Sequence, residues 1–108
     1  MTEVSLTELA RELLTHAREA RSGRGATTVH GGHDRSLRQT VMALRQGEHM
    51  HEHEHPGEVT LHVLHGQVRL VAGPDSWDGL PGDLLVVPER RHRVEAVRDC
   101  AFLFTTAR

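Results

Sequence analysis

The sequence predicts an all-β domain preceded by one α-helix. From Leu37 onward, short runs of apolar and β-branched residues are separated by Gly, Pro and Asp turn signals, as in β-sandwiches and β-barrels. Residues 5–20, in contrast, have the apolar spacing of an amphipathic helix. A chain of 108 residues can form one hydrophobic core but not two full domains. We therefore expect an N-terminal helix and linker in residues 1–25 and a β-barrel domain in residues 26–108.

The expected helix has a start signal, a stop signal and an apolar stripe. Ser5 and Glu8 form a capping box, and Gly23 and Gly25 follow the helix. Because a helix of this length is marginal alone, we expect its stripe to pack on the outside of the β-domain or on a partner subunit. The stripe consists of Leu6, Leu9, Ala10, Leu13, Leu14, Ala17 and Ala20.

Within the β-domain, the pattern typical of strands begins after Gly31 and Gly32. A histidine-rich strand should follow the first strand, and the last two strands can pair across a tight turn at Arg98 and Asp99. Turn signals surround Trp77, whose side chain we expect to be buried at a barrel end or a dimer contact. Apart from the histidine-rich strand, strands are expected at residues 37–44, 59–64, 68–71, 84–87, 93–97 and 100–105.

Six of the ten histidines lie within residues 47–66. In an unbroken strand, residues two apart share a face and lie about 6.5–7 Å apart along it. Imidazole is the commonest metal-coordinating side chain, so the pattern predicts a metal site on a strand, with its first histidine exposed at the entrance. The alternative is a solvated edge strand whose charge discourages edge pairing. The alternating histidines are His49, His51, His53 and His55.

Composition argues against several classes of protein. The 13 basic and 15 acidic residues give no basic excess, and three aromatic residues offer little surface for base stacking, so we expect no nucleic-acid partner. The sequence has no membrane-span pattern and no signal-peptide pattern. Cys100 is the sole cysteine, so no internal disulfide can form, and its apolar strand predicts a buried, inert thiol. We therefore expect a cytoplasmic protein without a membrane partner.

A second motif follows the histidine-rich strand: Gly82-Asp83-Leu84-Leu85-Val86-Val87-Pro88, and then His92. Together, the two stretches resemble the paired motifs of the cupin superfamily over residues 37–105, with the short interval of small bacterial cupins. The resemblance implies a jelly-roll β-barrel, a homodimer and a divalent transition metal inside the barrel. In cupins this metal is iron, manganese, nickel or zinc (Fe, Mn, Ni or Zn).

The first motif fits the cupin pattern in two ways. The first reading leaves Val59 at the position of the cupin glutamate and resembles the all-histidine cupins, among them the thiol dioxygenases. Its matching residues are Gly47, His53, His55 and Gly66. The second reading keeps a mixed ligand set, and its glycine comes one residue late. Its ligands are His51, His53 and Glu58.

The second motif contributes His92 in either reading. Arg90 replaces a cupin glycine, and His92 comes one residue earlier than the pattern has it. The resemblance therefore implies a metal site made from both motifs, with Glu58 as an additional candidate ligand. The metal ligands that we predict are His51, His53, His55 and His92.

A fold does not by itself define a function. The leading interpretation is a metal-binding cupin-domain protein that binds a small-molecule ligand in its barrel. One alternative is an enzyme, a metal-dependent dioxygenase or isomerase acting on a small metabolite. The other is a non-catalytic module that senses a ligand or stores a metal.

Overall fold

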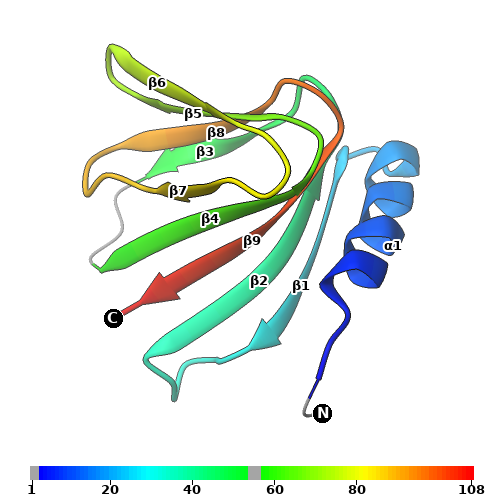
Figure 1. Cartoon of the computed structure of the whole chain (residues 1–108), viewed down its shortest axis with the longest axis horizontal. Helices are drawn as coiled ribbons and strands as arrows, with labels where there is room; N and C mark the ends of the chain where they lie inside the picture. The colour runs from blue at the N-terminus through cyan, green and yellow to red at the C-terminus, as the bar shows by residue number, and fades with distance from the viewer. Residues whose placement is uncertain (1–2, 54–56) are drawn as a thin grey trace.

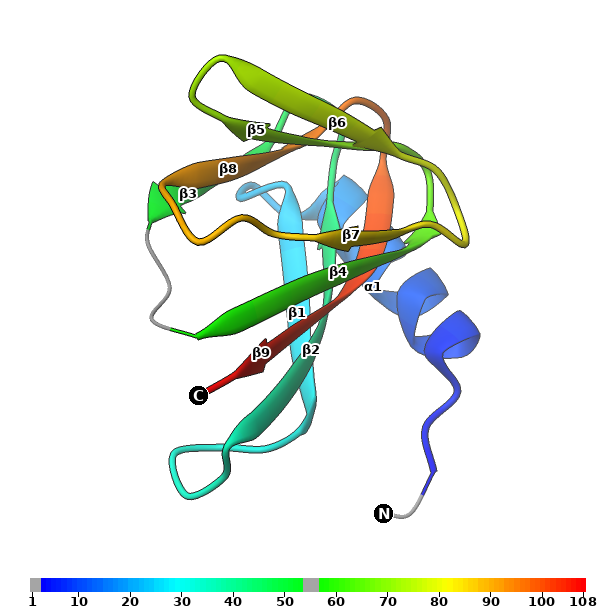
Figure 2. The same ribbon diagram turned by 60° about the vertical axis from the view of Figure 1, so that its left-hand side comes forward.

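The chain folds into two antiparallel β-sheets with a helix on the outside (Figures 1 and 2). The computed structural model describes residues 3–53 and 57–108, and of residues 51–53 it describes the backbone alone. The strand order is β1-β2-β9-β4-β7 in the five-stranded sheet and β3-β8-β5-β6 in the four-stranded sheet. This jelly-roll arrangement confirms the expected fold class.

Most strands lie where the apolar runs predict them, and two do not. β1 has no clear alternation of buried and exposed residues, and β6 (sequence DSWDG) is made largely of turn residues. Both form because an antiparallel neighbour supplies backbone hydrogen bonds: β2 pairs with β1, and β5 pairs with β6. The elements are α1 (Leu6–Glu19), β1 (Arg24–His30), β2 (Leu37–Leu44), β3 (His49–His53), β4 (Glu58–His65), β5 (Val68–Ala72), β6 (Asp75–Gly79), β7 (Leu84–Val86), β8 (His92–Ala96) and β9 (Cys100–Ala107).

Helix α1 packs on the outer face of the five-stranded sheet (Figure 1). Ser5 caps it by accepting a hydrogen bond from the Glu8 backbone N–H at 3.2 Å, as the capping box predicts. The helix buries four residues of its stripe against β2 and β9, which confirms the expected packing. The buried side chains of this layer are Ala10, Leu13, Leu14, Ala17, Val41, Ala43 and Ala101. The division of the chain at residue 25 stays a prediction.

The main hydrophobic core lies between the two sheets. Its largest fully buried side chain is Phe102 on β9. Burying a side chain of this class contributes roughly 1.5–3 kcal/mol. The core residues are Leu44, Val59, Leu61, Val63, Val68, Leu70, Val87, Val94, Ala96, Cys100 and Phe102.

The expected hairpin between the last two strands is wrong. β8 pairs with β3 and β5, whereas β9 pairs with β2 and β4, so the chain crosses between the sheets at this turn. Asp99 holds the crossing in place: its carboxylate accepts hydrogen bonds from the Gln46 backbone N–H and from Arg18 Nε, both at 2.8 Å. Arg18 lies in α1, so the turn also attaches the helix to the sheets.

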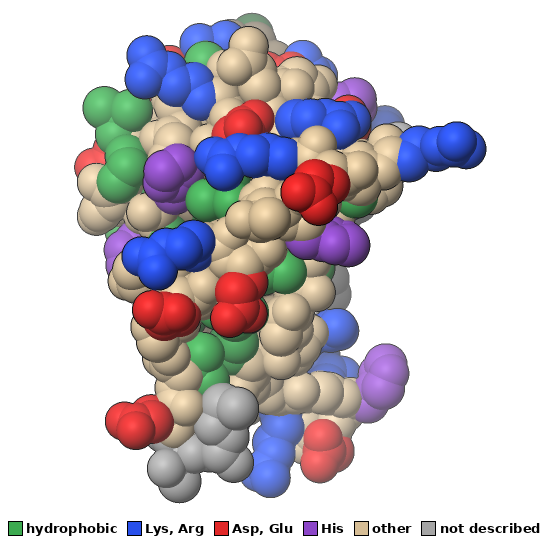
Figure 3. Space-filling model, turned by 90° about the vertical axis from the view of Figure 1, so that its right-hand side faces the viewer, with side chains coloured by type: hydrophobic (Ala, Val, Ile, Leu, Met, Phe, Trp, Pro, Cys, Tyr) green, Lys and Arg blue, Asp and Glu red, His purple; other side chains and the backbone are tan. Residues whose placement is uncertain are grey.

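Apolar side chains are exposed on β6 and β7, each of which is an edge strand of one sheet. Trp77 on β6 is 42% exposed in the single chain. The expectation that the single chain buries this side chain is therefore wrong. Leu84 and Val86 on β7 are more exposed still. On the helix-bearing face, in contrast, basic, acidic and histidine side chains are interspersed (Figure 3).

The homodimer stays a prediction. Among the described residues, no helix has the length and apolar character needed to cross a membrane.

A pair of glycine substitutions tests the turn after β4. Gly66 has φ +77°, and a Cβ there would collide with the Asp99 carbonyl oxygen, whereas Gly47 has φ +89° and open space around it. Gly47→Ala should therefore cost only the conformational strain, roughly 1–2 kcal/mol. Gly66→Ala should cost more, on the order of 3 kcal/mol, in urea unfolding. Equal losses would contradict the close approach of the two turns.

A second substitution tests the contact between α1 and the crossing turn. The Arg18 guanidinium, helped by the Gln46 N–H, lowers the pKa of the Asp99 carboxyl. The ionised group therefore adds stability above its ordinary pKa of about 3.9, and this is lost as the pH falls through the lowered pKa. Asp99→Asn should cost about 1 kcal/mol at pH 7, because the pair is partly exposed.

The difference from wild type should shrink as the pH falls below about 4. Asp34→Asn is the matched control, because the Asp34 carboxylate is highly exposed and lies 3.9 Å from Arg35. It should leave the unfolding free energy nearly unchanged at both pH values. A cost of Asp99→Asn that is independent of pH would contradict the assigned contact.

Candidate functional site

The pairing of β3 with β8 brings two of the predicted ligands into register. His49 pairs with Glu95, Met50 with Val94, and then His53 with His92. From Met50 to His53 there are three residue steps, but only two from Val94 back to His92, so β3 contains one extra residue. Such a bulge shifts all later residues to the other face of the strand. The expected unbroken alternation is therefore wrong between Met50 and His53.

The bulge puts position 53 opposite a residue of the core face. His92, Val94 and Ala96 are buried on alternate positions of β8, and the latter two belong to the core between the sheets. Directly opposite residues of an antiparallel pair share a face. His49, in contrast, is exposed, as expected, and is in register with Glu95 on the other face of β8. Residues 49 and 53 therefore pair with residues that lie on opposite faces of β8.

His92 is the buried histidine of this site, with 2% of its surface exposed. Its Nδ1 lies 2.9 Å from the Arg90 carbonyl oxygen. A carbonyl oxygen only accepts, so Nδ1 carries the proton and donates it. Metal-binding histidines are commonly oriented by a hydrogen bond of this kind. The position and orientation of His92 therefore fit a metal ligand.

The other predicted ligands are less well placed or lie outside the described part. Glu58 begins β4 and is exposed, whereas the next residue, Val59, is 3% exposed and belongs to the core. The Glu58 side chain thus lies on the outer face, which does not favour it as a partner of His92. His51 is described by its backbone, and His55 lies outside the described residues.

Within the residues whose side chains the structure describes, no three His, Cys, Asp or Glu form a group that could hold a metal ion. The full ligand set stays a prediction.

A cleft of about 420 Å³ opens beside β3 on the inner face of the five-stranded sheet. Its residues come from β1, β2 and β9, with Met50 from β3. No sequence motif indicates this cleft, but the alternation of β2 does: Val41 and Ala43 are buried under α1, so the alternate residues of β2 must face inward. The lining residues are Ala26, Thr28, Arg38, Thr40, Met42, Met50, Phe104 and Thr106.

Comparisons with known proteins agree on the fold. The sequence matches no protein-family model and no curated protein. Among solved structures, a cupin superfamily protein from Desulfitobacterium hafniense is 21% identical, with TM-score 0.73 and 82% of each chain covered. An RmlC-like cupin from Desulfovibrio desulfuricans is 22% identical, with TM-score 0.67, covering 99% of this chain and 91% of that one.

A third similar structure is the Cupin_2 domain of an XRE family transcriptional regulator from Enterobacter cloacae. It is 10% identical, with TM-score 0.68, covering 79% of this chain and 96% of that one.

The chain has a cupin fold. At these identities the similarity establishes the fold alone.

The first cupin-like motif spans β3 and β4, and the second spans β7, with His92 at the start of β8. Val59, at the glutamate position of the first reading, points into the core. Gly82 opens the second motif with φ +93°, and the Asp83 carboxylate accepts a hydrogen bond from the Leu80 N–H at 2.9 Å. Asp83 therefore stabilises the turn that leads into β7 and on to His92.

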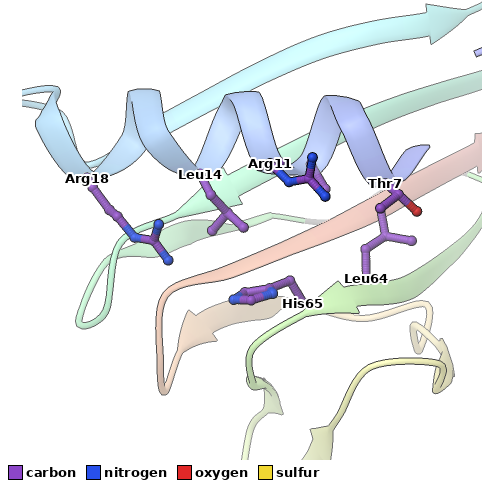
Figure 4. A pocket seen from close by; sticks show the side chains of 7 residues that line it. Thr7, Arg11, Leu14, Arg18, Leu64 and His65 are labelled. Carbon is purple, nitrogen blue, oxygen red and sulfur yellow. The ribbon is translucent and has the colours of Figure 1, made fainter. Parts of the chain in front are cut away.

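A second hollow of this protein lies between α1 and β4, on the outer face of the sheet (Figure 4). It has a volume of about 350 Å³ and includes Arg11, Arg18 and His65. Carboxylates already accompany both arginines: Asp99 lies 2.8 Å from Arg18, and Glu8 lies 3.6 Å from Arg11. The hollow is also on the opposite side of the sheet from the face that carries Val59. It therefore has a weaker claim as the functional site.

Two arginines near His92 in the sequence form ion pairs. Arg90 pairs with Asp75 at 2.7 Å, and Arg93 pairs with Glu95 at 2.9 Å. Their charges are therefore largely balanced within the protein.

The lone thiol is buried, as expected, and this gives a direct test. Cys100 has no exposed surface, and burial raises its pKa to about 12. The native protein should therefore not react with a disulfide reagent at pH 8, because the thiolate is both scarce and inaccessible. The urea-unfolded protein should give one equivalent of product. Rapid reaction of the native protein would contradict the packing of β9 in the core.

Proposed function

We propose that this chain is a metal-binding cupin that holds a small molecule in the cleft next to its metal. One observation carries the proposal: the bulge in β3 pairs His53 with the buried His92, whose Nδ1–H donates to the Arg90 carbonyl. Two histidines that face each other across an antiparallel pair lie within about 5.5 Å at the backbone, close enough to share an ion.

We propose His53 and His92 as the core of the ligand set, completed by His51, His55 or both. Glu58 is omitted, because it lies on the outer face of β4. Imidazole nitrogens suit zinc, nickel or ferrous iron, and availability and geometry select among them. A bound ion of this kind supplies Lewis acidity toward an oxygen of the small molecule.

The residues of the protein contribute orientation and binding in this proposal. The hydrogen bond from His92 Nδ1 to the Arg90 carbonyl fixes the orientation of the ring. The apolar parts of Met42, Met50 and Phe104 in the cleft offer the small molecule a dry surface.

A non-catalytic sensor or storage module is the second candidate. Two observations support it: the described lining of the cleft contains no carboxylate and no histidine that could transfer a proton, and a similar domain belongs to a transcriptional regulator. A dioxygenase or isomerase would depend on the metal for its chemistry. A bound compound that raises the melting temperature without being consumed would support the sensor, and turnover would support the enzyme.

The metal site is tested by histidine substitutions in untagged protein, since a histidine tag would bind metal itself. Removing both proposed ligands in His53→Ala/His92→Ala should abolish stoichiometric zinc binding, measured by elemental analysis and titration. The loss should exceed the roughly 10–100-fold that follows from removing a hydrogen-bond partner of a ligand. His92→Gln retains the bulk of the side chain and should show the same loss, so that a cavity in the core does not explain the result.

His49→Ala is the matched control. It removes an imidazole from the same strand, but at a position in register with Glu95 and outside the proposed set. Its zinc affinity should equal that of the wild type. Stoichiometric binding by the double variant, or an equal loss in the control, would overturn the proposed site.

A further inference from the structure

Among the described residues that line the cleft beside β3, Arg38 has the one charged side chain. It lies on the inner face of β2, two residues before Thr40 and four before Met42, which line the same cleft. Unlike Arg18, Arg90 and Arg93, it has no carboxylate within ion-pair distance in the described part of the chain. No described residue around it therefore balances the charge of this guanidinium.

The strand register surrounds Arg38 with hydroxyl groups. Arg38 pairs with Thr106, and Thr28 pairs with Thr40 one row further along. The hydroxyls of Thr28 and Thr40 lie 3.3 Å apart, so both point to the same side. Three threonine hydroxyls and one guanidinium thus face a floor made by the apolar side chains of Ala26, Met42, Met50 and Phe104.

The same row of residues leads from Arg38 to Val59 in the core between the sheets. Thr106 pairs with Arg38 on one side and with Val59 on the other. Val59 is the residue at the cupin glutamate position of the first reading, and its backbone carbonyl accepts a hydrogen bond from the Val87 N–H at 2.9 Å. At about 4.8 Å between neighbouring strands, Arg38 and Val59 are roughly 10 Å apart at the backbone. A small molecule can span that interval.

We propose that the cleft selects a small organic carboxylate with an apolar body, and that Arg38 binds its carboxylate group. This inference rests on the proposed function, because it names the class of molecule that the cleft holds next to the metal. A guanidinium matches a carboxylate with two parallel hydrogen bonds. The threonine hydroxyls can donate to further oxygens of the molecule, and the apolar floor accommodates its carbon chain.

A carboxylate fits these residues better than phosphate does. Phosphate sites usually combine several cations or backbone N–H groups, whereas the described lining of this cleft offers a single cation above an apolar floor. A carboxylic acid with a hydrocarbon body satisfies both parts of the lining.

The test compares acids with their uncharged amides of nearly equal shape: phenylacetate with phenylacetamide, and hexanoate with hexanamide. Protein labelled with ¹³C in the methionine methyl groups is titrated after metal removal by a chelator, and then again with zinc. Met42 and Met50 line the cleft, so their signals report its occupancy. In the wild type, each acid should bind about 10- to 100-fold more tightly than its amide, as expected for a charge-assisted hydrogen bond.

Arg38→Gln should remove this preference, and Arg38→Lys should retain part of it, because the charge remains without the fork geometry. Arg35→Gln is the matched control: Arg35 is an exposed arginine on the preceding loop that does not line the cleft, and its loss should leave the preference unchanged. Because the exposed Arg38 contributes little to the core, circular dichroism should show all variants folded.

Equal binding of acid and amide, an acid preference that survives in Arg38→Gln, or no change at either methionine with any probe would overturn the inference. Tighter binding of inorganic phosphate than of the acids would also overturn it. Because the first titration uses metal-free protein, this result is separable from the metal site. An acid preference in a protein that binds no zinc would support the carboxylate cleft and refute the metal site. Zinc binding without an acid preference would support the metal site and refute the carboxylate cleft.

Discussion

One extra residue in β3 determines which position of this strand pairs with the buried His92. In an unbroken ladder that continued the pairing of His49 with Glu95, residue 52 would lie opposite His92, and residue 53 opposite Arg91. The bulge moves residue 53 into register with the buried His92 instead. Bulges recur next to functional sites because they redirect a side chain without a change in the rest of the sheet. The proposed metal site depends on this irregularity, and the surrounding jelly roll only has to hold the two strands together.

The five-stranded sheet serves two purposes through the alternation of a single strand. On β2, Val41 and Ala43 face outward and are covered by α1, whereas Thr40 and Met42 face inward and line the cleft. The helix thus covers one face of the sheet and leaves part of the other accessible beside β3. Only the inner face also meets the core residues around Val59, so the cleft and the proposed metal share one side of the sheet.

Much of the fold follows from local sequence patterns, and the site follows less well. The capping box at Ser5 and the apolar alternation of β2 and β4 predict their elements because those signals are local. The side chains of β6 do not predict a strand, because this strand forms through its pairing with β5. The crossing at Asp99 resembles a hairpin turn in sequence, and only the packing of two sheets separates β8 from β9.

The site is predictable in its residue types but not in its register. Histidines in two separated segments indicate a shared ion, and His92 is buried as such a ligand should be. Strict alternation, however, gives no sign of the bulge before His53, because a register shift is set by the partner strand. The inward orientation of Arg38 is not evident from the sequence for a similar reason. A charged residue on a strand usually faces water, and Arg38 lies on the inner face because the helix covers the other face of β2.

The most direct measurement is anomalous diffraction at the zinc edge from crystals of the untagged protein loaded with zinc. We predict an anomalous peak that places a zinc ion between the two strands. This ion should coordinate Nε2 of His92 and an imidazole nitrogen of His53 at zinc–nitrogen distances of about 2.0–2.1 Å. Zinc bound only to other histidines, such as His62 or His65, with no metal at His92, would contradict the proposed pairing of the two strands around an ion.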